Sequence, residues 1–368
     1  MDRTAKPYIE IRLAVLNFAC VIDAKLKSLL SLLGFLLISI IGNSQVSVEI
    51  KYSPEKAHGP KIFTTPLPDG KFLFGKRFEA VPDPDGIIHL KIDLKKPGFL
   101  YTFTDAGFLS IYLEPGKTIN IEIGDDIRFS GQLKKENAYL YNFRRKYGKN
   151  GYAEFETKLA KTTSREAFID SLNTTIDSDI KRTNVTNTLN PEENATFESI
   201  KEFIVLDSKL FYYSHAFWAI SDKIELSKRN GTYDSAMLSY WDNVRVKLVD
   251  KDLINCNLTG SSWYSEYLFN YMGYLWTKNG GKYTTASEST TRSTSLANQY
   301  LSGIPKETYI SHYLSFFTIA GQAFKTPELL ALYNQFKKEF PKSSAIPLLE
   351  PKMRDVAKYA STDAPTSA

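Results

Sequence analysis

Cysteine and histidine are scarce in this chain of 368 residues, which contains two cysteines and four histidines. So few of these residues exclude a disulfide framework and argue against clustered Cys/His metal ligands. The histidines do not fall in a metal-ligand spacing such as H-E-x-x-H; they are His58, His89, His215 and His312. The sequence therefore predicts neither a metal site nor a cofactor.

A strong charge of one sign is also missing. Lys and Arg together number 46 and Asp and Glu 41, which leaves a net charge of +5, and the charges are scattered along the chain. A nucleic-acid-binding protein concentrates its basic residues on one face or segment, so we expect no nucleic-acid partner. The hydrophobic fraction of 43% and the charged fraction of 24% are typical of a globular protein long enough for two domains.

Long hydrophobic runs are limited to one near the N-terminus, Ser28–Ile41. Lys25 and Lys27 precede it and the small residues Gly42–Ser44 follow, which is the pattern of a secretory signal peptide. A membrane span is the alternative, but it needs about 20 apolar residues. We expect residues 1–44 to be a signal peptide with an extended lead-in, the mature chain to have no transmembrane span, and the protein to be exported to the periplasm or cell envelope.

Removal of residues 1–44 leaves one cysteine, Cys256, which cannot form an intramolecular disulfide. Its neighbours Leu253, Ile254 and Leu258 are apolar. We expect Cys256 to be a small buried hydrophobe rather than a reactive thiol.

The first part of the exported chain has the pattern of β-strands. Apolar and polar residues alternate over Val46–Ile50, Ile88–Ile92 and Thr118–Ile123. Turn signals such as Pro82–Gly86 and Glu114–Gly116 separate these runs. The pattern predicts an antiparallel β-sandwich or barrel-like domain over residues 45–131.

Helical patterns dominate from residue 132. Thr163 and Glu166 have the spacing of a capping box, and Asn190–Pro191 and Thr326–Pro327 each predict a helix start. We predict an all-α domain of helical hairpins over residues 132–358 and a disordered tail over residues 359–368, which makes the fold class α+β.

Two motifs suggest chemistry but favour turns. Gly70–Lys76 matches the first seven positions of a phosphate-binding loop, but Arg77 stands where Ser or Thr is required. Asp83-x-Asp85-Gly86 resembles the start of a calcium loop, but the remaining ligands do not follow. We predict a turn followed by a strand for the first motif and a tight hairpin turn for the second.

Aromatic residues are abundant, with 22 Tyr and 23 Phe. Tyr and Trp combine apolar area with a polar tip, which suits peptide and glycan recognition, but at helical spacing they suit a helix core equally well. The candidate residues for binding a partner or ligand are Trp218, Trp263, Tyr264, Tyr267 and Trp276.

Three stretches carry a resemblance to a known family. Tyr112–Ile121, Phe129–Leu140 and Leu332–Ser343 resemble the hairpin, the linker and the helix before the thioredoxin fold in TlpA-like thiol–disulfide oxidoreductases of the Bacteroidota envelope. The resemblance implies the N-terminal accessory region of such an enzyme. Thiol exchange needs two thiols, and the chain contains no C-x-x-C motif, so no catalytic residue is assigned.

Three functional hypotheses follow. The first is a non-catalytic exported envelope protein that binds a protein or peptide partner, as the accessory region of a TlpA-like oxidoreductase would. The second is a cell-surface module that binds glycans or peptides through exposed aromatic residues. The third is a hydrolase with unrecognised acidic catalysts, which requires a cleft with at least two carboxylates of shifted pKa.

Overall fold

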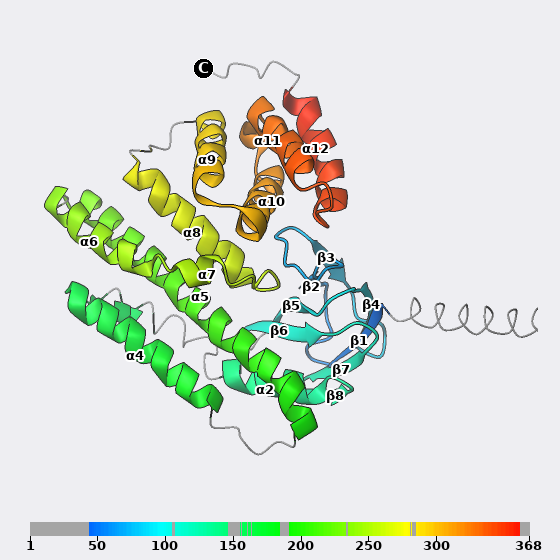
Figure 1. Cartoon of the computed structure of the whole chain (residues 1–368). Helices are drawn as coiled ribbons and strands as arrows, with labels where there is room; N and C mark the ends of the chain where they lie inside the picture. The colour runs from blue at the N-terminus through cyan, green and yellow to red at the C-terminus, as the bar shows by residue number, and fades with distance from the viewer. Residues whose placement is uncertain are drawn as a thin grey trace, which may run out of the picture. The chain divides into compact units, whose positions relative to one another are not determined.

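The computed structural model describes residues 44–104, 107–145, 155, 157–159, 161–162, 164–184, 191–232, 235–279, 281 and 285–360. The predicted signal peptide lies outside these residues except for Ser44. Strands occupy the N-terminal part and helices the C-terminal part, which confirms the α+β fold class (Figure 1). A search of the described helices for a membrane-spanning segment finds none with sufficient length and apolar character.

The strands form two four-stranded sheets. The first sheet has the order β4-β1-β7-β8 and contains β1 (Gln45–Tyr52), β4 (Ile87–Asp93), β7 (Thr118–Ile123) and β8 (Ile127–Gly131). The second has the order β3-β2-β5-β6 and contains β2 (Lys61–Thr64), β3 (Arg77–Ala80), β5 (Gly98–Thr104) and β6 (Gly107–Leu113). Side chains from both sheets share one core, including Ile50 and Ile121 from the first and Leu100 and Ile111 from the second, so the arrangement is a sandwich and not a closed barrel.

The antiparallel prediction is wrong for one pair of strands. β1 pairs with β7 in parallel, with Val48 opposite Ile119 and Ile50 opposite Ile121. The sequence between these two strands contains the whole of the second sheet, so no hairpin fixes their relative direction. The pairs β2–β3, β2–β5, β5–β6 and β7–β8 are antiparallel, as expected.

The helical part begins at Lys134. Its elements are α2 (Lys134–Arg145), α4 (Arg165–Asn184), α5 (Pro191–Arg229), α6 (Ser235–Leu248), α7 (Lys251–Ile254), α8 (Ser262–Lys278), α9 (Ala286–Tyr300), α10 (Gly303–Ile319), the 3-10 helix η1 (Gln322–Phe324), α11 (Pro327–Glu339) and α12 (Ile346–Ala360).

The C-terminal boundary of the helical prediction needs correction. The predicted tail of residues 359–368 starts too early, because Tyr359 and Ala360 still belong to α12. The Tyr359 ring lies 4.3 Å from the Lys325 ammonium, a contact that favours keeping this last turn helical. Residues 361–368 lie outside the described residues.

The helix starts follow the capping signals closely. α5 starts at Pro191 and α11 at Pro327, as predicted. α4 starts at Arg165, and the Ser164 hydroxyl accepts a hydrogen bond from the Ala167 N–H at 3.1 Å. Ser164 is therefore a capping residue of α4, whereas Thr163 of the predicted capping box lies outside the described residues.

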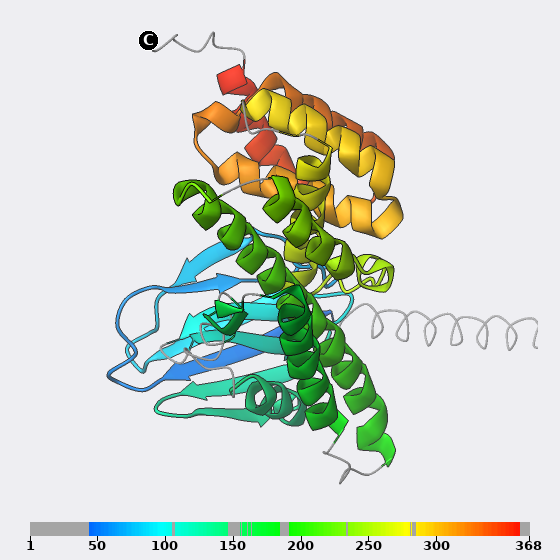
Figure 2. The same ribbon diagram turned by 90° about the vertical axis from the view of Figure 1, so that its left-hand side faces the viewer.

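Each of the two hydrophobic cores also contains side chains from the other part of the chain. Ile200 and Ile204 of α5 pack into the core of the sandwich, whereas Ile220 of the same helix lies in the helical core. In the opposite direction, Leu67 and Leu73 of the β2–β3 connection pack into the helical core. Figures 1 and 2 show α5 running from the sheets to the helical layers. The chain thus changes from strand to helix after Gly131, but the two cores do not divide at this residue.

Both motifs form turns and the first is followed by a strand, but the second turn is not a hairpin, because it joins β3 and β4, which belong to different sheets. No helix follows Gly70–Lys76, because β3 begins at Arg77, and a phosphate-binding loop is therefore excluded at this position. In the acidic turn the Asp83 carboxylate accepts the N–H groups of Asp85 at 3.0 Å and Ile87 at 2.8 Å. That carboxylate closes an Asx-type turn rather than a calcium loop.

Candidate functional site

A cavity of about 390 Å³ lies where α5, α8 and α10 meet the second sheet. We call it the aromatic cleft. The sheet and its β2–β3 connection contribute Thr64, Phe72, Phe74, Arg77, Tyr101 and Phe103, and the helices contribute Phe211, His215, Trp218, Ser262, Trp263, Glu266 and His312.

The helical wall of the cleft comes from helical periodicity. Phe211, His215 and Trp218 are spaced four and three residues apart on α5, which places them on one face of the helix. This face meets Trp263 of α8: the ring of Trp263 lies 4.8 Å from that of Phe211 and 6.4 Å from that of Trp218, in T-shaped arrangements. Such edge-to-face pairs fix the ring planes that line the cavity.

The opposite wall is held against the helices by backbone and side-chain hydrogen bonds. The Phe72 N–H donates to the Thr259 carbonyl at 2.7 Å, and the Tyr101 hydroxyl donates to the Gly260 carbonyl at 2.8 Å. The Ser315 hydroxyl donates to the Phe74 carbonyl. These bonds place the Phe72 ring 5.3 Å from the Tyr101 ring, so the sheet side of the cleft is also built of aromatic rings.

The rim of the cleft exposes large aromatic surfaces. Trp218 is 37% exposed and Phe103 is 64% exposed. Next to them, Phe316 of α10 is also exposed and its ring lies 5.6 Å from that of Phe74. A group of exposed rings at the mouth of a concave site is typical of a binding surface.

Glu266 supplies a carboxylate to the cavity that these aromatic rings line. Burial raises the pKa of Glu266, and a hydrogen bond with the Trp218 side chain acts in the opposite direction. The ion pairs recorded among the described residues do not include one to Glu266. Within the described ranges this carboxylate therefore loses hydration without a compensating cation.

His312 adds a second polar group with an unusual environment. Its side chain is 7% exposed, and its Nδ1 atom has no hydrogen-bond partner among the described residues. The imidazole packs between Phe74, at 5.6 Å, and Phe269, at 5.1 Å. Burial lowers the pKa of His312 to about 3, so this group is neutral at physiological pH.

Arg77 is the cationic group of the cleft and lies at its exposed side. The guanidinium carbon lies 4.6 Å from the centre of the Phe74 ring, which is a cation–π contact. No salt bridge joins Arg77 to Glu266 in the part of the chain that the structure describes. The cleft therefore combines aromatic rings, the carboxylate of Glu266, the imidazoles of His215 and His312, and the guanidinium of Arg77 at its exposed side.

Two of the five predicted binding residues, Trp218 and Trp263, lie together in the cleft. The other three lie in the helical core: Tyr264 and Tyr267 are fully buried, and Trp276 is buried as well. The hydroxyls of Tyr264 and Tyr267 donate to the carbonyls of Ile254 and Leu248, each at 2.7 Å. These three side chains are core residues, which was the alternative prediction for aromatic residues at helical spacing. They are therefore not accessible to a partner.

Several cleft residues were not identified from the sequence. Phe72 and Phe74 alternate with other residues like a strand, and both rings point to the cleft because the β2–β3 connection runs over the helices. Glu266 carried a signal that could have been used: it is the one acidic residue of α8, a helix otherwise rich in aromatic residues.

A second cavity of about 600 Å³ includes Cys256 in its lining, together with Lys71, Phe99 and Phe203. Lys71 is already engaged there, because its ammonium pairs with Glu307 at 2.8 Å and Asp69 at 3.1 Å. Cys256 is half-buried, and burial raises the pKa of its thiol to about 11. These properties agree with a packing role for the cysteine and not with a reactive thiol.

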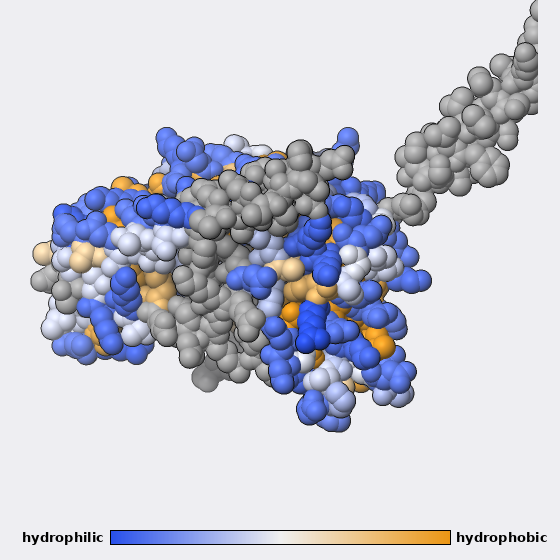
Figure 3. All heavy atoms as spheres, turned by 90° about the horizontal axis from the view of Figure 1, so that it is seen from below, coloured by the Kyte–Doolittle hydropathy of each residue, from blue (hydrophilic) through white to orange (hydrophobic). Residues whose placement is uncertain are grey.

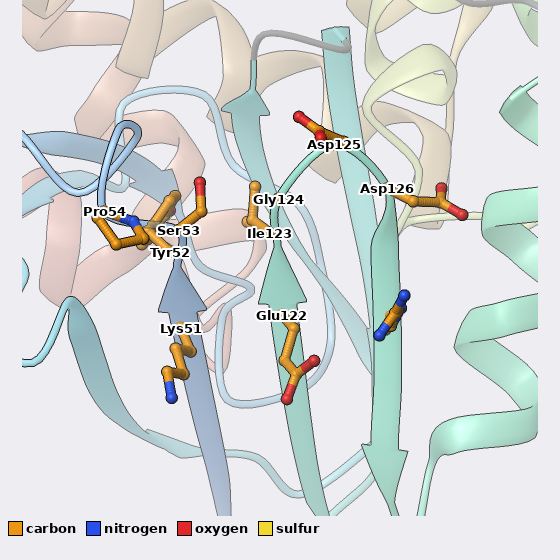
Figure 4. Close-up of a pocket in the computed structure, with 10 residues that line it drawn as sticks. Lys51, Tyr52, Ser53, Pro54, Glu122, Ile123, Gly124, Asp125 and Asp126 are labelled. Atoms are coloured by element: carbon orange, nitrogen blue, oxygen red, sulfur yellow. The ribbon is translucent and has the colours of Figure 1, made fainter.

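A third cavity of about 420 Å³ lies at the ends of β1, β7 and β8 (Figure 4). Half of its lining residues are charged, and all of these charged residues are exposed. Glu122 lies opposite Lys51 on β1 and opposite Arg128 on β8, so charges of alternating sign cross the sheet. Figure 4 shows Asp125 and Asp126 at the β7–β8 turn, pointing away from each other. This arrangement is a charge-balanced sheet surface.

The aromatic cleft differs in character from the face of the molecule that is seen from below. Seen from below, the described surface is mainly hydrophilic, with apolar residues in small separate patches (Figure 3). No group of three or more His, Cys, Asp or Glu side chains within the described ranges could hold a metal ion. The cleft contains one carboxylate, fewer than the two that the hydrolase hypothesis requires.

Comparison with known proteins gives no relatives: no family model matches the chain, and neither a curated protein nor a solved structure is similar to it.

Proposed function

We propose that this chain is a non-catalytic binding protein and that the aromatic cleft receives a side chain of a peptide or protein partner. The observation that carries the proposal is the exposure of Trp218 and Phe103 at the mouth of a cavity walled by further rings. Leaving such apolar area in water is unfavourable, at about 25 cal/mol per Å², and a partner that covers it recovers this free energy.

The polar groups of the cleft support binding rather than covalent chemistry. The Tyr101 hydroxyl is already used, because it donates to Gly260 and accepts the Ser262 N–H at 3.4 Å. His312 is a buried neutral imidazole, which suits a hydrogen bond to a bound group. A glycan presents many hydroxyls that each need a partner, whereas a peptide side chain needs few, so the composition of the walls favours a peptide.

The expectations from the sequence also describe a binding protein. The resemblance to the accessory region of TlpA-like oxidoreductases implies a partner-binding role without catalysis. Export to the periplasm or cell envelope would place the cleft where secreted or surface proteins are the available partners. Both remain predictions that rest on sequence motifs.

The proposal is tested by selecting peptides from a random displayed library against the immobilised chain and measuring their affinities. We expect selected peptides to share an anchor residue. Trp218→Ala should weaken their binding by about 30-fold, which corresponds to the loss of about 2 kcal/mol for an aromatic hot-spot side chain.

Leu226→Ala is the matched control, because Leu226 is exposed on the same helix α5 but does not line the cleft. Its affinities should stay within about twofold of the parent chain, since exposed side chains outside an interface contribute little. Recovery of no peptide, or equal affinities for the parent chain and the Trp218→Ala variant, would contradict the proposal.

A further inference from the structure

The ligand chemistry of the cleft is set by its one desolvated carboxylate. Resting on the proposed function, we infer that the anchor of the bound peptide is a basic side chain whose cation pairs with Glu266 in the cavity that Trp218 and Trp263 also line. The inference names both the class of ligand and the residue that selects it.

The first support is charge complementarity. Glu266 lines the cavity, is half-buried and has no cationic partner in the described part of the chain. A carboxylate in such an environment gains from any cation that replaces its lost hydration. Burial penalises the ionised carboxylate of Glu266, and a cation bound next to it offsets part of that penalty.

The second support is the aromatic surround. Trp218 and Trp263 lie with ring centres 6.4 Å apart and their planes inclined by 65°, and Phe211 adds a third ring next to Trp263. The faces of aromatic rings carry partial negative charge and attract cations, most strongly for Trp. The methylene stem of a lysine or arginine also covers apolar ring surface, so one side chain satisfies both features of the cleft.

The third support is the state of the other titratable groups that line the cleft. His312 is neutral at physiological pH because of its burial, so it does not repel a cation. Arg77 lies at the exposed side and is already held over the Phe74 ring. His215 packs between the Phe211 and Trp218 rings, at 4.1 and 4.7 Å. The position next to Glu266 is therefore the one where an incoming positive charge finds a negative partner.

The experiment compares two small probes that differ in charge: N-acetyl-lysine N-methylamide and its neutral counterpart N-acetyl-norleucine N-methylamide. Binding is followed by NMR through the indole N–H signals of the chain, which has four tryptophans. The signals of Trp218 and Trp263 report on the cleft, whereas those of the buried Trp241 and Trp276 serve as internal references.

We expect the lysine probe to bind at least tenfold more tightly than the norleucine probe. Glu266→Gln removes the charge but keeps the shape, so it should abolish this preference while leaving the norleucine affinity unchanged. Glu122→Gln is the control, because it removes the same charge from an exposed position on β7. It should leave the preference intact.

Equal binding of the two probes, or a lysine preference that survives Glu266→Gln, would overturn the inference and leave the proposed function standing. If neither probe shifts the signals of Trp218 and Trp263, the proposed function itself fails and the inference fails with it. A preference that is lost equally in Glu122→Gln and Glu266→Gln would assign the effect to net charge and also overturn the inference.

Discussion

Ser261 connects the start of α8 to a buried carboxylate on α5, and its replacement by alanine should destabilise the chain strongly. Its hydroxyl donates to Asp207, which is 4% exposed. The same oxygen accepts the N–H groups of Trp263 at 3.0 Å and Tyr264 at 3.3 Å, which makes Ser261 the N-cap of α8. Since α8 carries Trp263 and Glu266, this cap also orients the helical wall of the cleft.

The expected loss is the sum of two contributions. Removing a serine N-cap costs about 1 kcal/mol. Taking a hydrogen-bond donor away from a buried acceptor costs about 1–3 kcal/mol more. Ser261→Ala should therefore lower the free energy of unfolding by about 2–4 kcal/mol, a large part of the stability of an ordinary protein.

The measurement is urea unfolding followed by far-ultraviolet circular dichroism. Ser302→Ala is the matched control, because Ser302 is the N-cap of α10, a helix of the same length of 17 residues, but makes no capping hydrogen bond with its side chain. We expect the Ser302→Ala variant to stay within about 0.5 kcal/mol of the parent chain, as exposed substitutions usually do. Ser261→Thr keeps the hydroxyl and should recover most of the loss.

The reasoning would be refuted by a Ser261→Ala variant as stable as Ser302→Ala. Ser261→Thr adds a methyl group at a buried position, so a stability between those of Ser261→Ala and the parent chain agrees with the reasoning.

Two further predictions concern titratable groups. His312 has a pKa lowered by burial from 6.5 to about 3, so between these values the unfolded chain binds a proton that the folded chain does not. The contribution of His312 to the free energy of unfolding should therefore be constant above pH 6.5 and fall below it by up to about 1.4 kcal/mol per pH unit. Denaturant unfolding at pH 4 to 7 should show a smaller slope of the unfolding free energy against pH for His312→Leu than for the parent chain. Parallel plots for the two chains would contradict the assignment. Cys256, with its pKa raised to about 11, should react with the thiol reagent DTNB at pH 8 far more slowly in the folded Cys20→Ser chain than in guanidinium, because it has roughly 100-fold less thiolate than an ordinary thiol. Equal rates in the two conditions would show that burial does not protect it.

Local sequence patterns predicted the bounds of some strands and helices well. β7 covers Thr118–Ile123, the alternating run in the sequence, because each apolar residue of this strand faces the core. α5 begins at Pro191 because proline suits the first turn of a helix. The parallel pairing of β1 with β7 was not predictable in this way, because strand partners far apart in sequence are chosen by the packing of the whole sandwich.

The cleft was predictable only in part, and α8 shows why. Its aromatic residues cover more than one face, so periodicity alone does not separate the buried Tyr264 and Tyr267 from Trp263, which lines the cleft. The buried face of α8 is the one from which the hydroxyl groups of Tyr264 and Tyr267 reach the carbonyls of Ile254 and Leu248. Those partners depend on tertiary structure and leave no mark in the sequence of α8 itself.

The walls of the cleft come from both cores, and this couples binding to folding. Phe72 and Tyr101 belong to the part rich in strands, yet both are bonded to the Thr259–Gly260 segment that precedes α8. A chain with only one core formed would lack one wall. The apparent affinity is the intrinsic affinity multiplied by the fraction of binding-competent chains, so a variant that stays almost fully folded loses very little affinity through unfolding. Weaker binding by such a variant therefore reports a change in the alignment of the walls. Ser261→Ala separates these cases: if the loss of about 2–4 kcal/mol leaves the chain folded, any loss of lysine-probe affinity reports on the position of Trp263 and Glu266.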